Sequence, residues 1–167
     1  MLYFPTKTNS IFLLSVYYLL HTDPHIKPFK APAFSFHGQY DGVMMMSKEF
    51  ADGSGLDVHI RTTRVDNPHM SYSYISGTAV KIGTDILEVQ DNGSIIVNGD
   101  EFLLEEAETA GTTFAGYPIT KTMKGTKRNI FVYDLALDVD SDKSIEIRFN
   151  IKTGMIFVDV SGGSFPE

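Results

Sequence analysis

The chain has 167 residues with 43% hydrophobic and 21% charged side chains, a composition typical of one globular domain with a core of useful size. Its formal net charge of −7 argues against nucleic acid as a partner, because binding to phosphates requires a basic surface. The absence of cysteine excludes disulfides, thiolate zinc sites and cysteine nucleophiles.

The start of the chain contains Lys7 and then an apolar run over residues 11–20. This run is too short to cross a bilayer as a helix, which takes about 20 residues. A weakly basic start followed by a short apolar run is typical of a secretory signal peptide, and we predict one over residues 1–21. The alternatives are a buried or edge strand that continues the sheet, or a wrongly assigned start.

A stretch punctuated by prolines follows over residues 22–40, and it is the most distinctive sequence in the chain. Pro24 and Pro28 fix φ at about −65° and bias the residues before them towards extended conformations, so a helix is excluded here. Residues 34–37 then alternate apolar and polar side chains, which predicts a half-buried strand. We expect residues 41–47 to pair with this strand as a hairpin.

This stretch resembles the opening of a von Willebrand factor type D domain, whose signature is G-D-P-H-x-x-T-F-D-G and a strand ending in G-x-C or G-x-Y. The D-P-H is the most specific part of the match, and Thr22 stands where the family has glycine. Residues 55–62 and 82–89 also resemble later strands of the family, so the similarity extends to the end of the chain. The matching motif residues are Asp23, Pro24, His25, Phe29, Phe34, Phe36 and Gly38.

The D-P-H segment has two interpretations. Some relatives with the complete motif cleave their own chain at the Asp-Pro bond, so the resemblance makes Asp23, Pro24 and His25 a candidate autoproteolysis site. Such cleavage requires the histidine to lie close to a strained peptide bond. The simpler interpretation is a rigid segment, because Thr22 lacks the conformational freedom of the glycine it replaces.

In the family, calcium is held by the Asp of the F-D-G turn and by residues of a C-terminal C-G-x-C-G-N-x-N-G loop. Here Lys30 and Ala31 follow the motif's phenylalanine, and no such loop precedes the last residue, Glu167. The resemblance therefore implies no calcium site of the family's type, and we predict neither a metal nor another cofactor. It also implies a domain over residues 22–167 that is incomplete at its C-terminus.

The rest of the chain predicts strands and turns in succession. Leu56, Val58 and Ile60 alternate with polar residues and indicate a half-exposed strand, and residues 145–151 have the same period. This succession predicts an all-β fold, an antiparallel sandwich or barrel, and we favour a β-sandwich of short strands preceded by the hydrophobic N-terminal segment. Further strands are expected over residues 71–75, 79–82, 86–89, 95–97, 117–123, 129–139 and 155–160.

Asn-Gly pairs at residues 92–93 and 98–99 predict turns, because both residue types tolerate positive φ. Asn92 also begins the sequence Asn-Gly-Ser, which makes it the candidate glycosylation site in a eukaryotic secretory pathway. A plain type I′ turn explains the same residues equally well.

Two other patterns have ordinary explanations. Asp138, Asp140 and Asp142 copy the spacing at the start of an EF-hand loop, but Lys143 stands where that loop needs glycine. We therefore expect an acidic turn between strands. The histidines are scattered, and His59 lies on the polar side of its strand, which predicts a surface position.

No spacing typical of a catalytic triad, a phosphate loop or a histidine zinc site occurs, and we predict that the chain is not an enzyme. The resemblance implies an extracellular module, secreted or displayed at a cell surface, for adhesion, matrix assembly or protein–protein interaction. Its expected partners are extracellular proteins or matrix components, with no nucleic acid and no stable membrane span. The alternative is a carbohydrate-binding sandwich in which Tyr72, Tyr74 or Tyr117 stacks on sugar rings. A sandwich-type hydrolase would need two converging carboxylates in a pocket.

Overall fold

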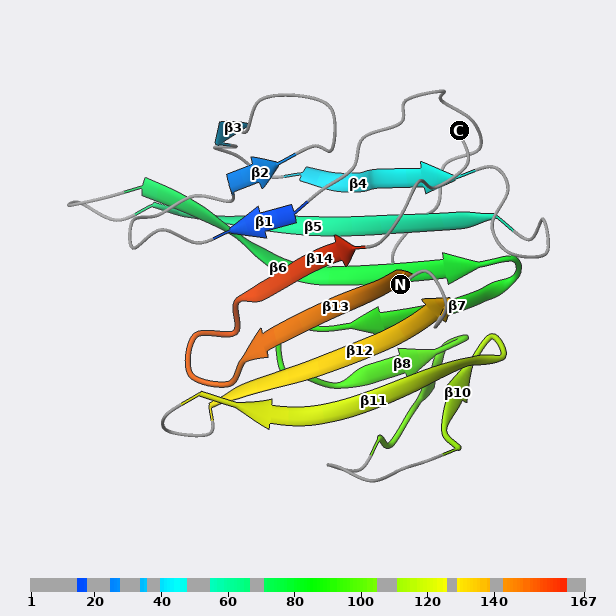
Figure 1. Cartoon of the computed structure of the whole chain (residues 1–167). Helices are drawn as coiled ribbons and strands as arrows, with labels where there is room; N and C mark the ends of the chain where they lie inside the picture. Colours follow the sequence, from blue (N-terminus) through cyan, green and yellow to red (C-terminus); the bar gives the residue numbers. More distant parts are fainter. Residues whose placement is uncertain are drawn as a thin grey trace.

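Fourteen β-strands form the regular structure of the residues that a computed structural model describes, namely 15–17, 25–27, 34–35, 40–47, 55–66, 71–104, 111–125, 129–138 and 143–161 (Figure 1). No helix occurs among these residues, and the predicted all-β class is confirmed. The strands are β1 (Ser15–Tyr17), β2 (His25–Lys27), β3 (Phe34–Ser35), β4 (Tyr40–Ser47), β5 (Leu56–Asp66), β6 (Ser71–Ile82), β7 (Asp85–Val89), β8 (Ile95–Val97), β9 (Asp100–Glu101), β10 (Thr113–Phe114), β11 (Tyr117–Lys124), β12 (Ile130–Asp138), β13 (Lys143–Asn150) and β14 (Ile156–Ser161).

The strands form one antiparallel sheet that curls round a core (Figure 1). Its main path runs β10-β11-β12-β13-β14-β6-β7-β8-β9, and β6 also pairs with β5, which pairs with β4. On the other side, β14 pairs with β1, and β2 lies between β1 and β3. The two halves meet where β14 pairs with β6, at Ile75 and Ile156. Because the sheet is continuous, the finer prediction of a sandwich is not confirmed.

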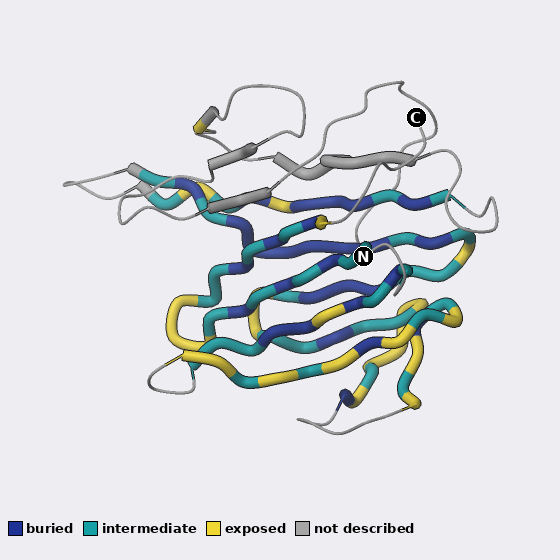
Figure 2. Tube along the Cα trace, viewed as in Figure 1, coloured by how far each residue is buried: buried dark blue, intermediate teal, exposed yellow. Residues whose placement is uncertain are grey.

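Alternating apolar residues on the inner face of the curled sheet form the core. In β13, Ile145, Ile147 and Phe149 are buried while the residues between them are partly exposed, as the sequence period predicts. Figure 2 shows the same alternation along strands of both halves. Burial of apolar surface stabilises the fold by about 25 cal/mol per Å². The core cluster consists of Leu56, Val58, Ile60, Ile75, Val80, Ile82, Leu87, Val89, Ile95, Leu104, Phe114, Ile119, Tyr133, Leu135, Leu137, Ile145, Ile147, Phe149, Ile156, Val158 and Val160.

A β-bulge divides the long strand β6 into two parts that face in opposite directions. Arg61 of β5 pairs with Gly77, but Thr62 pairs with Ile75, so Ser76 is an extra residue in β6. The Ser76 hydroxyl donates a hydrogen bond of 3.4 Å to the Arg61 carbonyl oxygen. Because successive residues alternate between faces, one extra residue exchanges the inner and outer faces. Inner positions of β6 are therefore odd-numbered before the bulge and even-numbered after it.

Two hairpin turns consist of two residues with positive φ, the geometry of a type I′ turn. Asn98 and Gly99, with φ of 52° and 93°, join β8 to β9 as predicted. Ala115 and Gly116, with φ of 51° and 83°, join β10 to β11. The Asn98 amide also donates a hydrogen bond of 2.9 Å to the Asp85 carboxylate, which anchors its turn to β7. Ala115 adopts the same conformation with a Cβ that crowds the backbone.

Two predictions for strands are wrong. β4 pairs with β5 rather than with the strand that starts at Phe34, and that strand, β3, pairs with β2. The physical reason is length: β5 has 11 residues and β3 has 2, so β5 offers β4 a much longer ladder of hydrogen bonds. Ile151 is 45% exposed in the turn after β13, because the apolar alternation of that strand ends at Phe149.

Part of the apolar N-terminal run belongs to the sheet. Residues Ser15–Tyr17 form β1, which pairs with β2 along its length and with β14 at Asp159. This corresponds to the strand interpretation of the run, while the signal peptide over residues 1–21 stays a prediction. Among the described residues, none belongs to a helix with the length and apolar character needed to cross a membrane.

Candidate functional site

Two tyrosines lie next to each other on the outer face of β6, close to its start. Tyr72 and Tyr74 precede the bulge, so they face away from the buried Ile75. Their ring centroids are 6.4 Å apart, their rings are inclined by 39°, and both residues are partly exposed. On the neighbouring strand, Val65 pairs with Tyr72 and Thr63 pairs with Tyr74. We call these four residues the tyrosine patch.

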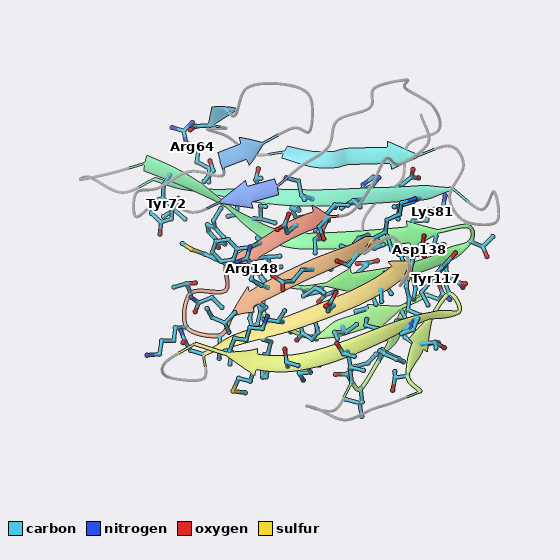
Figure 3. All side chains as sticks on the ribbon, in the orientation of Figure 1. Arg64, Tyr72, Lys81, Tyr117, Asp138 and Arg148 are labelled. Atoms are coloured by element: carbon cyan, nitrogen blue, oxygen red, sulfur yellow. The ribbon has the colours of Figure 1, made fainter. Side chains whose placement is uncertain are left out.

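One arginine, Arg61, borders the tyrosine patch. Arg61 of β5 is exposed and lies on the same face as Thr63. Arg64 is also exposed, but it pairs with Ser73, so it points to the opposite side of the sheet from Tyr72, as Figure 3 shows. The Thr63 hydroxyl donates a hydrogen bond of 2.7 Å to the Ser76 hydroxyl, which connects the patch to the bulge. The patch thus has aromatic rings and one guanidinium group on the same face, although the whole chain is acidic. Aromatic residues and arginine are enriched in protein interfaces.

Tyr117, the third tyrosine proposed for sugar stacking, belongs to another part of the molecule. It begins β11 directly after the turn at residues 115–116, and it packs partly buried against the core. Tyr117 and Tyr72 are at opposite sides of the view in Figure 3. The fold therefore brings together two of the three candidate tyrosines.

The D-P-H segment contributes His25 to the sheet as the first residue of β2, where it pairs with Tyr17 and Ser35. Phe34 begins β3 and pairs with Ile26. The bond between Asp23 and Pro24 lies outside the described residues, so autoproteolysis stays a prediction. The other motif residues lie outside the described residues: Asp23, Pro24, Phe29, Phe36 and Gly38.

Asn92 is exposed in the turn between β7 and β8. Its side-chain oxygen accepts a hydrogen bond of 2.8 Å from the Ser94 N–H, and the Gly93 N–H donates one of 2.9 Å to the Gln90 carbonyl oxygen. Gly93 has a φ of 79°, whereas Asn92 is not among the residues with positive φ. The turn is therefore a type I turn followed by a glycine bulge, and the predicted type I′ turn is wrong. Glycosylation of Asn92 stays a prediction.

His59 is buried, with 0% exposure, so its predicted surface position is wrong. The alternation placed it on the outer face of β5, away from Val58 and Ile60, but this face is covered at that point. On this outer face, His59 pairs with Ala79, and Ala79 pairs with Glu88. Both of these residues are buried too. The sequence period shows which face a residue takes, and it does not show whether other parts of the chain cover that face.

A row of carboxylates crosses the outer face of β12, β13 and β14. Asp134 pairs with Glu146, which pairs with Asp159. Lys124 and Arg148 lie 3.5 and 3.2 Å from the Glu146 carboxylate. Desolvation, and then the charge of Glu146, raises the pKa of Asp134 above 3.8, while Lys124 acts in the opposite direction. No three potential metal ligands cluster in the described part of the chain, so this row is an electrostatic feature of the surface.

The structure also contains a concave region that the sequence analysis did not predict. It lies where the curled sheet stays open between β9 and β11, and Lys121 is part of its lining. Lys121 lies on the inner face of β11, in register with Tyr133 and between Ile119 and Met123. The available sequence signal was a lysine at an inner position of an alternating strand.

Comparison of the sequence with models of known protein families gives no match, and comparison with curated proteins gives none either. The resemblance to von Willebrand factor type D domains therefore rests on the motif residues alone. The fold and the site define an all-β scaffold with a partly exposed pair of aromatic side chains on its outer face.

Proposed function

We propose that this chain is a non-catalytic recognition module that binds an extracellular protein through the tyrosine patch. The observation that supports this best is the pair of partly exposed rings of Tyr72 and Tyr74, 6.4 Å apart on one face of β6. Tyrosine and arginine are among the residues that contribute most to the binding free energy of protein interfaces. Both residue types occur here, because Arg61 borders the patch.

The scaffold favours binding because it holds the patch in place before a partner arrives. β5 and β6 are paired from Leu56 and Ile82 at one end to Asp66 and Ser71 at the other. A tyrosine side chain has only two torsion angles, so fixing it against a partner costs little conformational entropy. Less of the interaction energy is then spent on ordering the surface.

The D-P-H resemblance supports the same proposal independently, since it implies an extracellular module for adhesion, matrix assembly or protein–protein interaction. A signal peptide over residues 1–21 would deliver the chain to that compartment. Autoproteolysis at Asp23 and Pro24 is a separate proposal from the same motif. Intact mass after incubation in mild acid tests it: two fragments that meet at this bond support it, and an unchanged mass contradicts it.

A carbohydrate partner is the second candidate, and the geometry of the same two rings favours it. Sugar rings present apolar C–H groups that stack on aromatic faces. Rings 6.4 Å apart can contact neighbouring sugar units of one chain. Tyr117 has no part in this alternative, because it lies elsewhere in the molecule.

The test compares the wild-type chain with a Tyr72→Ala/Tyr74→Ala double variant and with Tyr117→Ala as the matched control. Affinity is measured for a panel of deglycosylated matrix proteins and, separately, for a glycan array. We expect the double variant to lose about tenfold or more in affinity for a matrix protein, and the control to bind like the wild type. Binding to glycans alone would support the second candidate. Equal binding by the double variant and the wild type would contradict both.

A further inference from the structure

The open edge of the curled sheet carries a depression of about 410 Å³. Its lining comes from the turn that joins β7 to β8, from the start of β8, from the end of β9 and the residues that follow it, and from β11. Figure 1 shows where these elements lie. Ile95 and Leu104 form its buried base, and Phe102 and Leu103 extend the apolar surface to the rim, where Leu103 is 83% exposed. The lining combines apolar and polar side chains, and a few hundred Å³ is the usual size of a small-molecule site.

Lys121 supplies a positive charge inside this depression. Its Nζ donates a hydrogen bond of 3.1 Å to the Leu104 carbonyl oxygen and lies 4.4 Å from the centre of the Phe131 ring. The ring face stabilises the cation electrostatically. An ammonium group has three N–H donors, so the bond to Leu104 leaves donors for a ligand. The ammonium group is thus held in place and remains able to bind an anion.

We infer that this depression binds a small organic molecule with a single carboxylate on an apolar body. The carboxylate would form a charge-assisted hydrogen bond with Lys121, and the apolar body would cover Ile95, Leu104 and Leu103. The exposed Glu101 at the rim carries a negative charge that repels a second anionic group. One positive group within and one negative group at the rim therefore select monocarboxylates over dicarboxylates.

One wall of the depression is fixed before any ligand binds. Gly93 has a φ of 79°, and a Cβ at this residue would lie 2.5 Å from the Phe149 ring. The Tyr133 hydroxyl donates a hydrogen bond of 3.2 Å to the Gly93 carbonyl oxygen. The turn that contains Asn92 and Ser94 is thereby held against the core. A preformed site reduces the entropic cost of binding.

The test uses octanoate as the probe, titrated into the whole chain by calorimetry and by NMR. We expect saturable binding of octanoate, with weaker binding of octanol, which lacks the charge, and of suberate, the dicarboxylate of equal length. Lys121→Met should weaken octanoate binding about tenfold or more, because it removes the charge-assisted hydrogen bond and keeps the side-chain length. Lys124→Met is the matched control on the outer face of the same strand, and it should bind like the wild type.

Absence of saturable octanoate binding to the wild type, or equal affinities of the two lysine variants, would overturn the inference. If Lys121→Met fails to fold, Glu101→Gln provides the second test: it should raise the affinity for suberate more than the affinity for octanoate, and equal changes in the two affinities count against the site. The Tyr72→Ala/Tyr74→Ala variant should keep octanoate binding. Failure of this site and failure of the protein-recognition proposal are therefore separate results.

Discussion

Replacement of Gly93 by alanine tests how the two halves of the curled sheet pack on each other. Gly93 belongs to the turn between β7 and β8, and Phe149 belongs to β13 in the opposite half. An added Cβ would lie 2.5 Å from Cε1 and 2.8 Å from Cδ1 of Phe149, closer than real Cβ atoms approach a ring. Gly99, with φ of 93° and no heavy atom within 4 Å of its added Cβ, is the matched control.

The two substitutions share one cost and differ in the other. A left-handed backbone conformation destabilises the folded state of an alanine variant by about 1–2 kcal/mol. The lower conformational entropy of its unfolded chain offsets about 0.4–1 kcal/mol of this loss. Gly99→Ala should therefore destabilise the fold by about 0–1.6 kcal/mol. Gly93→Ala also crowds a buried ring, which adds about 1–3 kcal/mol and brings its expected loss of stability to about 1–4.6 kcal/mol.

Urea unfolding of both variants, followed by circular dichroism, measures this difference. Phe149→Leu in the Gly93→Ala background should recover about 1 kcal/mol or more relative to the sum of the two single changes, because the smaller side chain leaves room for the added methyl group. Equal destabilisation by the two glycine substitutions would refute the proposed packing. Strict additivity in the double variant would refute it too.

Three further substitutions test separate features. Ala115→Gly should stabilise the chain by about 0.5–1 kcal/mol in thermal unfolding, because φ of 51° crowds the alanine Cβ; destabilisation would contradict this. Asp134 has a raised pKa, so its contribution to stability is complete below pH 3.8 and is lost as pH rises through the folded-state pKa. Asp134→Asn should remove that decline from the pH profile of unfolding, and an identical profile would count against it. Tyr133→Phe should cost about 0.5–1.5 kcal/mol, because it removes the hydrogen bond to Gly93. Burial raises the pKa of Tyr133 to about 12, so the variant should also lack a tyrosine that ionises at about this pH in an absorbance titration.

Local alternation was sufficient to predict the longer strands in the second half of the chain, whereas the two-residue strands β9 and β10 were not predicted. Expected strands at 117–123 and 129–139 correspond to β11 and β12, because each of these strands has one face in the core. Pairing depends on distant partners, which explains why β4 was assigned to the wrong neighbour. The bulge at Ser76 is also invisible to a period of two, since it results from the register with β5.

The candidate site could be predicted by residue type and not by position. Tyr72 and Tyr74 were chosen with Tyr117 because all are aromatic, and only the three-dimensional arrangement separates the third from the other two. His59 was placed on the correct face of its strand, but its burial depends on parts of the chain far away in sequence. Lys121 lies at an inner position that a local pattern would assign to the core.

Nitration of tyrosines with tetranitromethane, mapped by mass spectrometry, tests most directly whether the bulge turns the tyrosine patch outward. We expect early modification of Tyr72 and Tyr74 and protection of Tyr133, which is only 2% exposed. Modification of Tyr133 before Tyr72 and Tyr74 would contradict the assignment of faces in β6, and the proposed recognition surface would fail with it.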